Sequence, residues 1–139
     1  MIRVRVIDHV VLRSRNVERL VAFYSSVLGC EVERTLPAAV GLIQLRAGDS
    51  LIDIVDVDSE LGRAGGGPPA PSGKNLDHVC LRIEPLSQED LRRWLAQHGV
   101  EPGEYSNRYG AQGFGPSLYI EDPDGNVVEL RNDLVASDP

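Results

Sequence analysis

The stretch "IDHVVLR" at residues 7–13 returns as "LDHVCLR" at residues 76–82, and this repetition decides the fold. Five of the seven letters are identical, and the two that differ are apolar in both copies. Each copy reads as a strand. An amphipathic helix pattern follows each strand, with Asn16 as the expected N-cap in the first copy and Ser87 in the second.

Three further strand patterns follow each expected helix. They cover residues 31–36, 40–46 and 50–57 in the first copy, and 100–106, 116–121 and 126–131 in the second. The order βαβββ therefore occurs twice and predicts an α+β fold. The expected division is a first module at residues 1–58, a Gly/Pro-rich linker at 59–75, a second module at 76–131 and a tail at 132–139.

Composition excludes several classes of protein. The chain of 139 residues has a net charge of −7 and no cluster of Lys or Arg, so nucleic acid is not an expected partner. No apolar run approaches the roughly 20 residues that span a bilayer, so no membrane partner is expected. The charged, alternating start "MIRVRVIDHV" reads as a strand, not a signal peptide, which predicts a cytoplasmic location with Cys30 and Cys80 as reduced thiols.

Four polar residues occupy equivalent places in the two copies. His9 and His78 lie in the first strands, and superposing "LIDI" on "VVEL" makes Asp53 equivalent to Glu129. A carboxylate inside an apolar strand such as "LIDIV" is costly unless it has a partner or a metal. Two imidazoles and two carboxylates are typical ligands of a divalent metal. The alternative is a duplicated scaffold in which these are ordinary core histidines and solvent-facing acids.

The motifs "DHVVLR", "VAFYSSVLGCEV", "LDHVCLRI" and "YIEDPDGNVVEL" resemble the vicinal oxygen chelate superfamily, also called the glyoxalase/bleomycin-resistance/dioxygenase fold. The resemblance implies that two βαβββ modules form a cupped, barrel-like mixed sheet with helices outside. It also implies that His9, His78 and Glu129 bind one divalent ion (Zn, Ni, Mn, Fe or Co). Asp53 matches the position of a fourth ligand in the family. That ligand is commonly Glu, whose side chain is one methylene longer than that of Asp53.

The resemblance implies a glyoxalase-like lyase or isomerase that acts on a small oxygenated substrate through a metal-stabilised enediolate, with Glu129 and Asp53 as candidate bases. Two alternatives stay open: a fosfomycin-type thiol transferase, and a protein that sequesters a small antibiotic or toxin. In this superfamily, ring-cleaving dioxygenases usually have a further catalytic histidine near the metal. The one spare histidine here, His98, ends the second helix pattern, so a dioxygenase is less expected.

Candidate substrate contacts are Arg82, Arg108 and Tyr109. Arg82 shares a strand face with His78, and the other two lie in the Gly-rich segment at residues 106–117. That segment is expected to be either a lid over the cup or a plain hairpin loop. Half-open sheets expose strand edges, and edges seek partners, so we also expect a two-fold homodimer.

Overall fold

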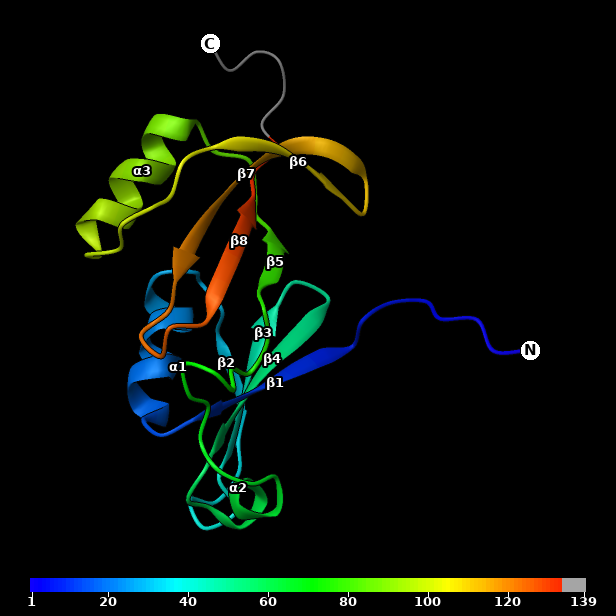
Figure 1. The fold of residues 1–139 in the computed structure, drawn as a ribbon, viewed down its shortest axis with the longest axis vertical. Coiled ribbons are helices and arrows are strands. Elements are labelled where there is room, and N and C mark those ends of the chain that lie inside the picture. Colours follow the sequence, from blue (N-terminus) through cyan, green and yellow to red (C-terminus); the bar gives the residue numbers. More distant parts are fainter. Residues whose placement is uncertain (134–139) are drawn as a thin grey trace. The chain divides into compact units, whose positions relative to one another are not determined.

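The computed structural model describes residues 1–133, and the chain divides into two compact units after Asn75 (Figure 1). Of the expected tail, residues 134–139 lie outside the described residues. None of the helices within residues 1–133 is long and apolar enough to cross a membrane.

The first unit is a four-stranded mixed sheet with two helices. Its strands are β1 (His9–Ser14), β2 (Val32–Thr35), β3 (Leu42–Ala47) and β4 (Ser50–Asp56), and its helices are α1 (Val17–Ser26) and α2 (Glu60–Ala64). The strand order is β1-β4-β3-β2, with β1 parallel to β4 and the other pairs antiparallel. Helix α1 packs on β3 and β4 and buries Leu20, Phe23 and Tyr24.

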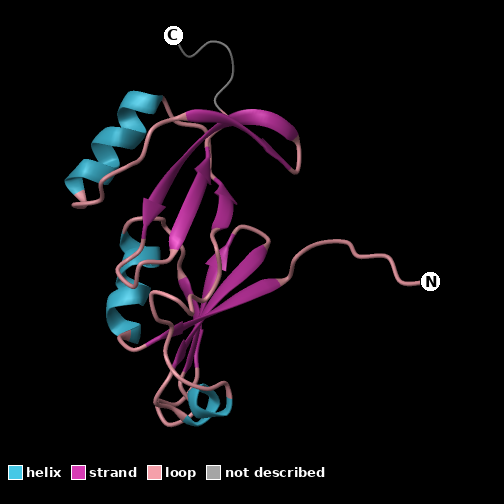
Figure 2. Ribbon diagram, in the orientation of Figure 1, coloured by secondary structure: helices cyan, strands magenta, loops and turns pink. Residues whose placement is uncertain are grey.

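The second unit repeats this plan (Figure 2). It contains β5 (Val79–Arg82), α3 (Gln88–Gln97), β6 (Ser106–Gly110), β7 (Gly113–Glu121) and β8 (Val127–Arg131). Its order, β5-β8-β7-β6, matches the first sheet strand for strand. The two βαβββ modules are thus confirmed. The barrel-like closure is not, because each described sheet is open and ends in two edge strands.

Both long helices begin at the predicted N-caps. The Asn16 side chain accepts a hydrogen bond from the Arg19 N–H at 3.2 Å, and the Ser87 hydroxyl accepts one from the Asp90 N–H at 3.0 Å. These side chains satisfy N–H groups that the first helical turn leaves without partners. The apolar stripe of α3 is narrower than its spacing predicts: Leu91 and Leu95 are buried, but Trp94 is 43% exposed.

Residues 59–75, predicted to be a linker, contain α2 and are held against β1. The Arg13 guanidinium donates to three backbone carbonyl oxygens, those of Gly62, Gly66 and Gly67. The Asn75 side chain accepts from the Arg13 N–H at 3.1 Å and donates to the Arg13 carbonyl at 3.0 Å. This segment is therefore fastened by one arginine and one asparagine.

The segment 106–117 is a strand hairpin, not the predicted loop. Residues 106–110 form β6 and pair antiparallel with β7, while most of the predicted strand at 100–106 lies outside any strand. Glycine content suggested a loop, but these glycines have specific places. Gly113 has φ +96° at the turn, and Gly110 and Gly115 lie where a Cβ would come within 2.7 and 2.2 Å of Arg131 side-chain atoms.

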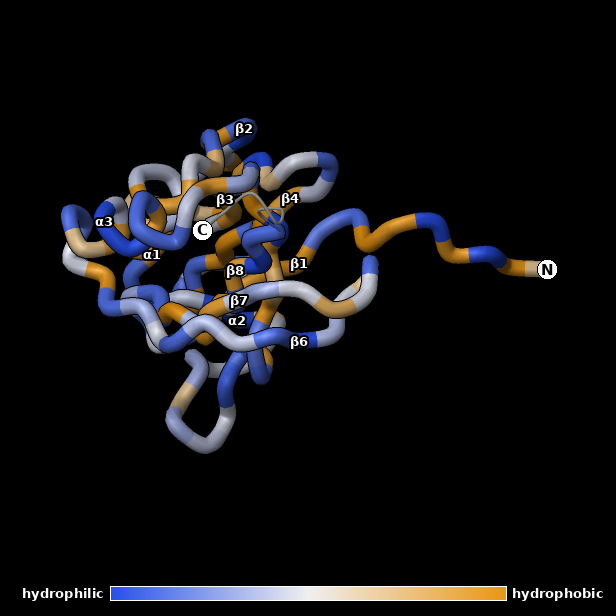
Figure 3. Tube along the Cα trace, turned by 90° about the horizontal axis from the view of Figure 1, so that it is seen from above, coloured by the Kyte–Doolittle hydropathy of each residue, from blue (hydrophilic) through white to orange (hydrophobic). Residues whose placement is uncertain are grey.

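The first seven residues form an extended N-terminal arm. A strand was predicted from Met1 onward, but β1 begins at His9 because its partner β4 begins at Ser50. The arm, residues 1–7, projects beyond the sheet of its own unit (Figure 1) and alternates between hydrophobic and hydrophilic positions (Figure 3).

Candidate metal centre

The strand registers place the two histidine–carboxylate pairs in equivalent positions. In the first unit, Val11 lies opposite Asp53, two residues after His9. In the second, Cys80 lies opposite Glu129, two residues after His78. Since residues two apart share a face of a strand, each carboxylate lies on the same sheet face as its histidine. This geometry agrees with the superposition drawn from the sequence alone.

Each histidine is bonded to the aspartate that precedes it. The His9 Nδ1 lies 2.7 Å from the Asp8 carboxylate, and the His78 Nδ1 lies 2.7 Å from the Asp77 carboxylate. A carboxylate partner assigns the proton to Nδ1 and leaves Nε2 as an acceptor, which is the arrangement that orients metal-binding histidines. The pKa of His9 is raised above 6.5, chiefly by the Asp8 hydrogen bond, with desolvation opposing and the Asp53 charge adding to the rise.

In the second unit, two acceptor atoms face each other. The His78 Nε2 lies 3.2 Å from a carboxylate oxygen of Glu129, a residue only 6% exposed. With its proton on Nδ1, the imidazole offers Glu129 a lone pair, so the contact needs a shared proton or a cation. Two ligands each about 2.1 Å from one ion and at right angles to each other would lie about 3.0 Å apart. The observed separation fits that requirement.

Glu129 has two further partners that sequence reasoning missed. The Tyr119 hydroxyl and the Cys80 thiol both lie beside its carboxylate, and each is a donor that it can accept from. Desolvation, and then the negative charge of Glu129, raise the pKa of both Tyr119 and Cys80. Each therefore keeps its proton at neutral pH and can donate it to Glu129. The His78 ring also meets the Tyr119 ring edge-on, with 5.4 Å between centroids.

In the first unit, Asp53 is 2% exposed and is held by one side chain. The Gln44 amide donates to its Oδ2 at 3.1 Å. Its other oxygen, Oδ1, is buried and accepts no hydrogen bond from the residues that the structure describes. A buried carboxylate oxygen without a donor is expensive, and a cation would offset that cost. The Gln44 carbonyl oxygen in turn accepts from the Arg34 guanidinium at 3.2 Å.

These observations fit a divalent cation. Within residues 1–133, no three or more His, Cys, Asp or Glu side chains gather to hold a metal, and each unit by itself places one of these histidines and one of these carboxylates on the same sheet face. The donors are nitrogen and carboxylate oxygen, the set that Zn²⁺, Mn²⁺, Ni²⁺ and Fe²⁺ accept. The bare oxygen of Asp53 and the facing acceptors of His78 and Glu129 are the features a cation would satisfy.

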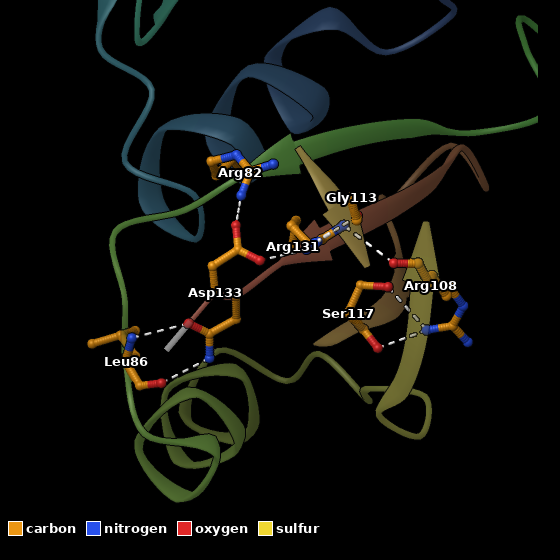
Figure 4. Close-up of polar contacts among 8 residues, drawn as sticks. Arg82, Leu86, Arg108, Gly113, Ser117, Arg131 and Asp133 are labelled. Atoms are coloured by element: carbon orange, nitrogen blue, oxygen red, sulfur yellow. Dashed lines mark hydrogen bonds and ion pairs between the residues drawn. The ribbon is translucent and has the colours of Figure 1, made fainter. Parts of the chain in front are cut away.

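The predicted substrate residues lie in different surroundings. The Arg108 guanidinium donates to the carbonyl and hydroxyl oxygens of Ser117 at 2.6 and 3.0 Å (Figure 4). It also lies 4.5 Å above the centre of the Tyr119 ring. Arg82 is ion-paired with Asp133. Tyr109 is 75% exposed and packs edge-on against Phe114. Arg108 therefore lies next to a partner of Glu129, whereas Arg82 already has a counterion and Tyr109 faces solvent.

A buried arginine fixes the β6–β7 hairpin beside this site. Arg131 is 3% exposed and lies two residues after Glu129 on β8. Its guanidinium donates to Asp133 at 2.5 Å, to the Gly113 carbonyl at 3.0 Å and to the Arg108 carbonyl at 3.3 Å (Figure 4). Because the hairpin carries Arg108, Arg131 holds the backbone from which Arg108 reaches Tyr119.

Known proteins are similar to this chain in sequence and in fold. The glyoxalase domain-containing protein RDO1 of Mycosarcoma maydis is 29% identical over an alignment of 140 positions. The alignment covers 93% of this chain and 69% of that protein. The virulence protein STM3117 of Salmonella typhimurium is 28% identical, with a TM-score of 0.68 over 96% of this chain and 100% of that one.

Two more distant structures show the fold alone. Lactoylglutathione lyase of Agrobacterium tumefaciens is 22% identical, with a TM-score of 0.63 over 91% of this chain and 92% of that one. The antibiotic-binding protein TnmS3 of Streptomyces sp. CB03234 is 18% identical, with a TM-score of 0.67 over 96% and 100%. The family model described as the Glyoxalase/Bleomycin resistance protein/Dioxygenase superfamily matches residues 6–130, and the chain therefore belongs to this superfamily.

Proposed function

We propose that this chain is a divalent-metal-dependent enzyme of the glyoxalase type, with lyase or isomerase chemistry on a small oxygenated substrate. The superfamily contains enzymes and non-catalytic proteins that bind small molecules. One observation carries the choice of an enzyme: the His78 Nε2 and the Glu129 carboxylate face each other at 3.2 Å as two acceptors. A cation held between these two atoms would stabilise the enediolate of such a reaction, a role that enclosure of an organic ligand does not require.

The residues that would hold the metal are His9, Asp53, His78 and Glu129, contributed as one pair from each unit of one chain or of two copies. The cation expected is one of Zn²⁺, Ni²⁺, Mn²⁺, Fe²⁺ and Co²⁺. When bound, it would lower the free energy of an enediolate formed by proton loss beside a substrate carbonyl.

Glu129 is the residue we assign to accept that proton. Its side chain is one methylene longer than that of Asp53, and it is nearly buried, so water competes little for its oxygens. Tyr119 and Cys80 lie beside the carboxylate and can donate to it, which would orient its oxygens. A base oriented in this way typically contributes roughly 10²–10⁴-fold to the rate. Asp53 would then serve the charge balance of the site more than proton transfer.

Arg108 is the best placed of the three candidate substrate contacts. Its guanidinium lies over Tyr119 on the side of the sheet that carries Glu129. An arginine at that place favours a substrate with a carboxylate or phosphate group, because its planar donors match two acceptor oxygens. Arg82 would first have to leave Asp133, and Tyr109 would act only at the edge of the site.

A sequestering protein is the second candidate. The supporting observation is that His78, if doubly protonated, and Glu129 satisfy each other as an ion pair without any metal. A protein of similar fold, TnmS3, is an antibiotic-binding protein. In this case Tyr119 and Arg108 would be ligand contacts, and no substrate would be turned over.

The test uses solvent exchange as the readout. The protein is incubated in heavy water with each divalent cation and a panel of α-hydroxy carbonyl compounds, thiohemiacetals and acyl thioesters, and deuterium at the α-carbon is followed by NMR. We expect exchange with at least one compound and its loss in Glu129→Gln, whereas Glu121→Gln, an exposed glutamate at the end of β7, keeps it. Tight binding without exchange would favour sequestration, and a thiol adduct of an epoxide would favour a transferase.

A further inference from the structure

We propose that Arg82 and Arg131 form a subsite for a substrate carboxylate, and that Asp133 fills this subsite when no substrate is bound. The two arginines lie directly opposite each other on the parallel strands β5 and β8. They therefore share a sheet face, and like charges in register destabilise a sheet unless an anion lies between them. In this structure the anion is the Asp133 carboxylate, toward which both guanidinium groups turn (Figure 4).

The two arginines differ in how firmly they are held. Arg131 is 3% exposed, and besides Asp133 its guanidinium hydrogen-bonds the backbone carbonyls of Gly113 and Arg108. The Arg82 side chain is 36% exposed and is ion-paired with Asp133. One arginine is therefore fixed by the hairpin, and the other can adjust to an anion that enters from solvent.

Asp133 is suited to exchange with an external carboxylate. It follows the end of β8, belongs to no helix or strand, and has a side chain that is 31% exposed. A partly exposed ion pair contributes little net free energy, because water solvates both partners well when they separate. An external carboxylate offers the arginines the same two oxygens, so the exchange replaces one charge-assisted contact by another.

The subsite lies on the same sheet face as the candidate metal ligands, one strand repeat away. Arg131 is two residues after Glu129 on β8, and Arg82 is two residues after Cys80 on β5. Two residues of a strand span about 7 Å. Cys80, which lies between His78 and Arg82 on this face, is small and exposed, so the face is open between the two levels.

This placement indicates a substrate class, an inference that rests on the proposed function. A substrate that chelates the metal through two neighbouring oxygens would reach the arginines with a carboxylate about 7 Å away. Short 2-hydroxy or 2-oxo dicarboxylates have both features. Because the chain carries a net charge of −7, such an anion needs local positive charge in order to bind, and the two arginines supply it.

The first experiment tests the subsite without a metal. Metal-free protein is titrated with acetate, and with acetamide as the uncharged analogue, while backbone amide shifts are followed by NMR at constant ionic strength. We expect saturable binding of acetate around Arg82 and Arg131. Binding should be at least roughly tenfold weaker for acetamide and in Arg82→Gln, because a charge-assisted hydrogen bond is lost. Arg92→Gln, at an exposed position on α3, is the control and should bind acetate normally.

A second variant tests the role of Asp133. Asp133→Asn should bind acetate roughly tenfold more tightly, the gain expected when a competitor that fills the site about nine-tenths of the time is removed. Asp49→Asn makes the same change in charge at an exposed turn and should show no gain. An affinity that does not rise in Asp133→Asn overturns the proposed exchange. If that variant folds poorly, the acetate and acetamide comparison still decides the subsite, and equal affinities for the two compounds overturn it.

The last experiment tests the link between the subsite and the metal. Protein loaded with Zn²⁺ is titrated by calorimetry with 2-hydroxy dicarboxylates of increasing length. We expect one length to bind most tightly, and Arg82→Gln to remove that preference without changing the affinity for Zn²⁺. Acetate binding without any length preference would overturn the substrate class. Failure to take up a metal would overturn the proposed function and the substrate class with it, whereas the acetate titration decides the subsite by itself.

Discussion

The two units share a backbone plan and differ in what they place opposite the carboxylate. On the neighbouring antiparallel strand, Gln44 lies opposite Asp53 in the first unit and Tyr119 lies opposite Glu129 in the second. The Gln44 amide donates to Asp53 at 3.1 Å, and the Tyr119 hydroxyl lies beside Glu129 as a donor that it can accept from. On the parallel side, Val11 in the first unit corresponds to Cys80 in the second, and only the cysteine can donate.

The different surroundings suit Asp53 and Glu129 to different roles. Asp53 has one protein donor and one buried oxygen that no described residue satisfies. Glu129 has the His78 Nε2 at 3.2 Å and two potential donors, Tyr119 and Cys80, beside it. The first unit is suited to supply charge to a cation, and the second to hold a base in place. Duplication preserved the register and the histidine–aspartate contact, while the side chains around each carboxylate diverged.

The largest expected effect is a loss of metal affinity on removal of either histidine, one from each unit. His9→Ala and His78→Ala should each lower the affinity for a divalent cation by more than the roughly 10–100-fold that loss of a supporting partner costs. Both side chains are partly exposed, at 46% and 34%, so the fold should survive. Isothermal titration calorimetry measures the affinity, and circular dichroism checks the fold. Unchanged metal binding in both variants would show that these histidines do not bind a metal.

The aspartates that precede the histidines come next. Asp8→Asn and Asp77→Asn should each weaken metal binding by about 10–100-fold, because the imidazole loses the partner that fixes its tautomer. Asp49→Asn, an exposed aspartate in the β3–β4 turn, is the matched control and should have no effect. A large effect in only one of the two units would show that the copies are equivalent in register but not in function.

A stability measurement sharpens the contrast between the two carboxylates. In metal-free protein, Gln44→Leu should lower the free energy of unfolding by about 1–3 kcal/mol, since it leaves both oxygens of buried Asp53 without a donor. Tyr119→Phe should cost less, because Glu129 keeps the Cys80 thiol as a potential donor. Urea denaturation gives both values. The assignment fails if the order is reversed.

The smallest expected effect is a titration. In metal-free protein, NMR should find the His9 pKa above 6.5, and Asp8→Asn should lower it, since the Asp8 hydrogen bond is the main cause of the rise. A raised pKa means that protonated His9 stabilises the fold below about pH 6.5, and this contribution disappears as the pH rises through the folded-state value. A pKa that does not move in Asp8→Asn would contradict this cause.

The parts of the fold that could be predicted from sequence are those that occur in both copies of the internal repeat. The repeated "DHV" and the final strands give the register of His9 with Asp53 and of His78 with Glu129, because alternation fixes which residues share a face. The same repeat contained a signal for the Asp–His contacts, since an aspartate precedes each histidine. The sequence alone did not establish these contacts, because neighbouring side chains bond only when the imidazole ring turns toward the carboxylate.

The remaining features depend on contacts distant in sequence. Tyr119 becomes a partner of Glu129 only through the β7–β8 register. Cys80, which the sequence marks only as a reduced thiol, is exposed and lies beside the same carboxylate. The β6–β7 hairpin was read as a loop because glycine usually marks turns, whereas Gly110 and Gly115 leave space for a side chain from another strand.

The place of Arg131 has a consequence for how this protein can evolve. Its guanidinium lies where the Cβ of any residue other than glycine at positions 110 and 115 would have to go. A side chain at either glycine would force the guanidinium to shift from its contacts with Asp133 and the hairpin backbone, and loss of the arginine removes the reason for the glycines. The three positions should therefore covary across descendants of this chain, and a library that randomises them together should recover folded combinations that single substitutions never reach.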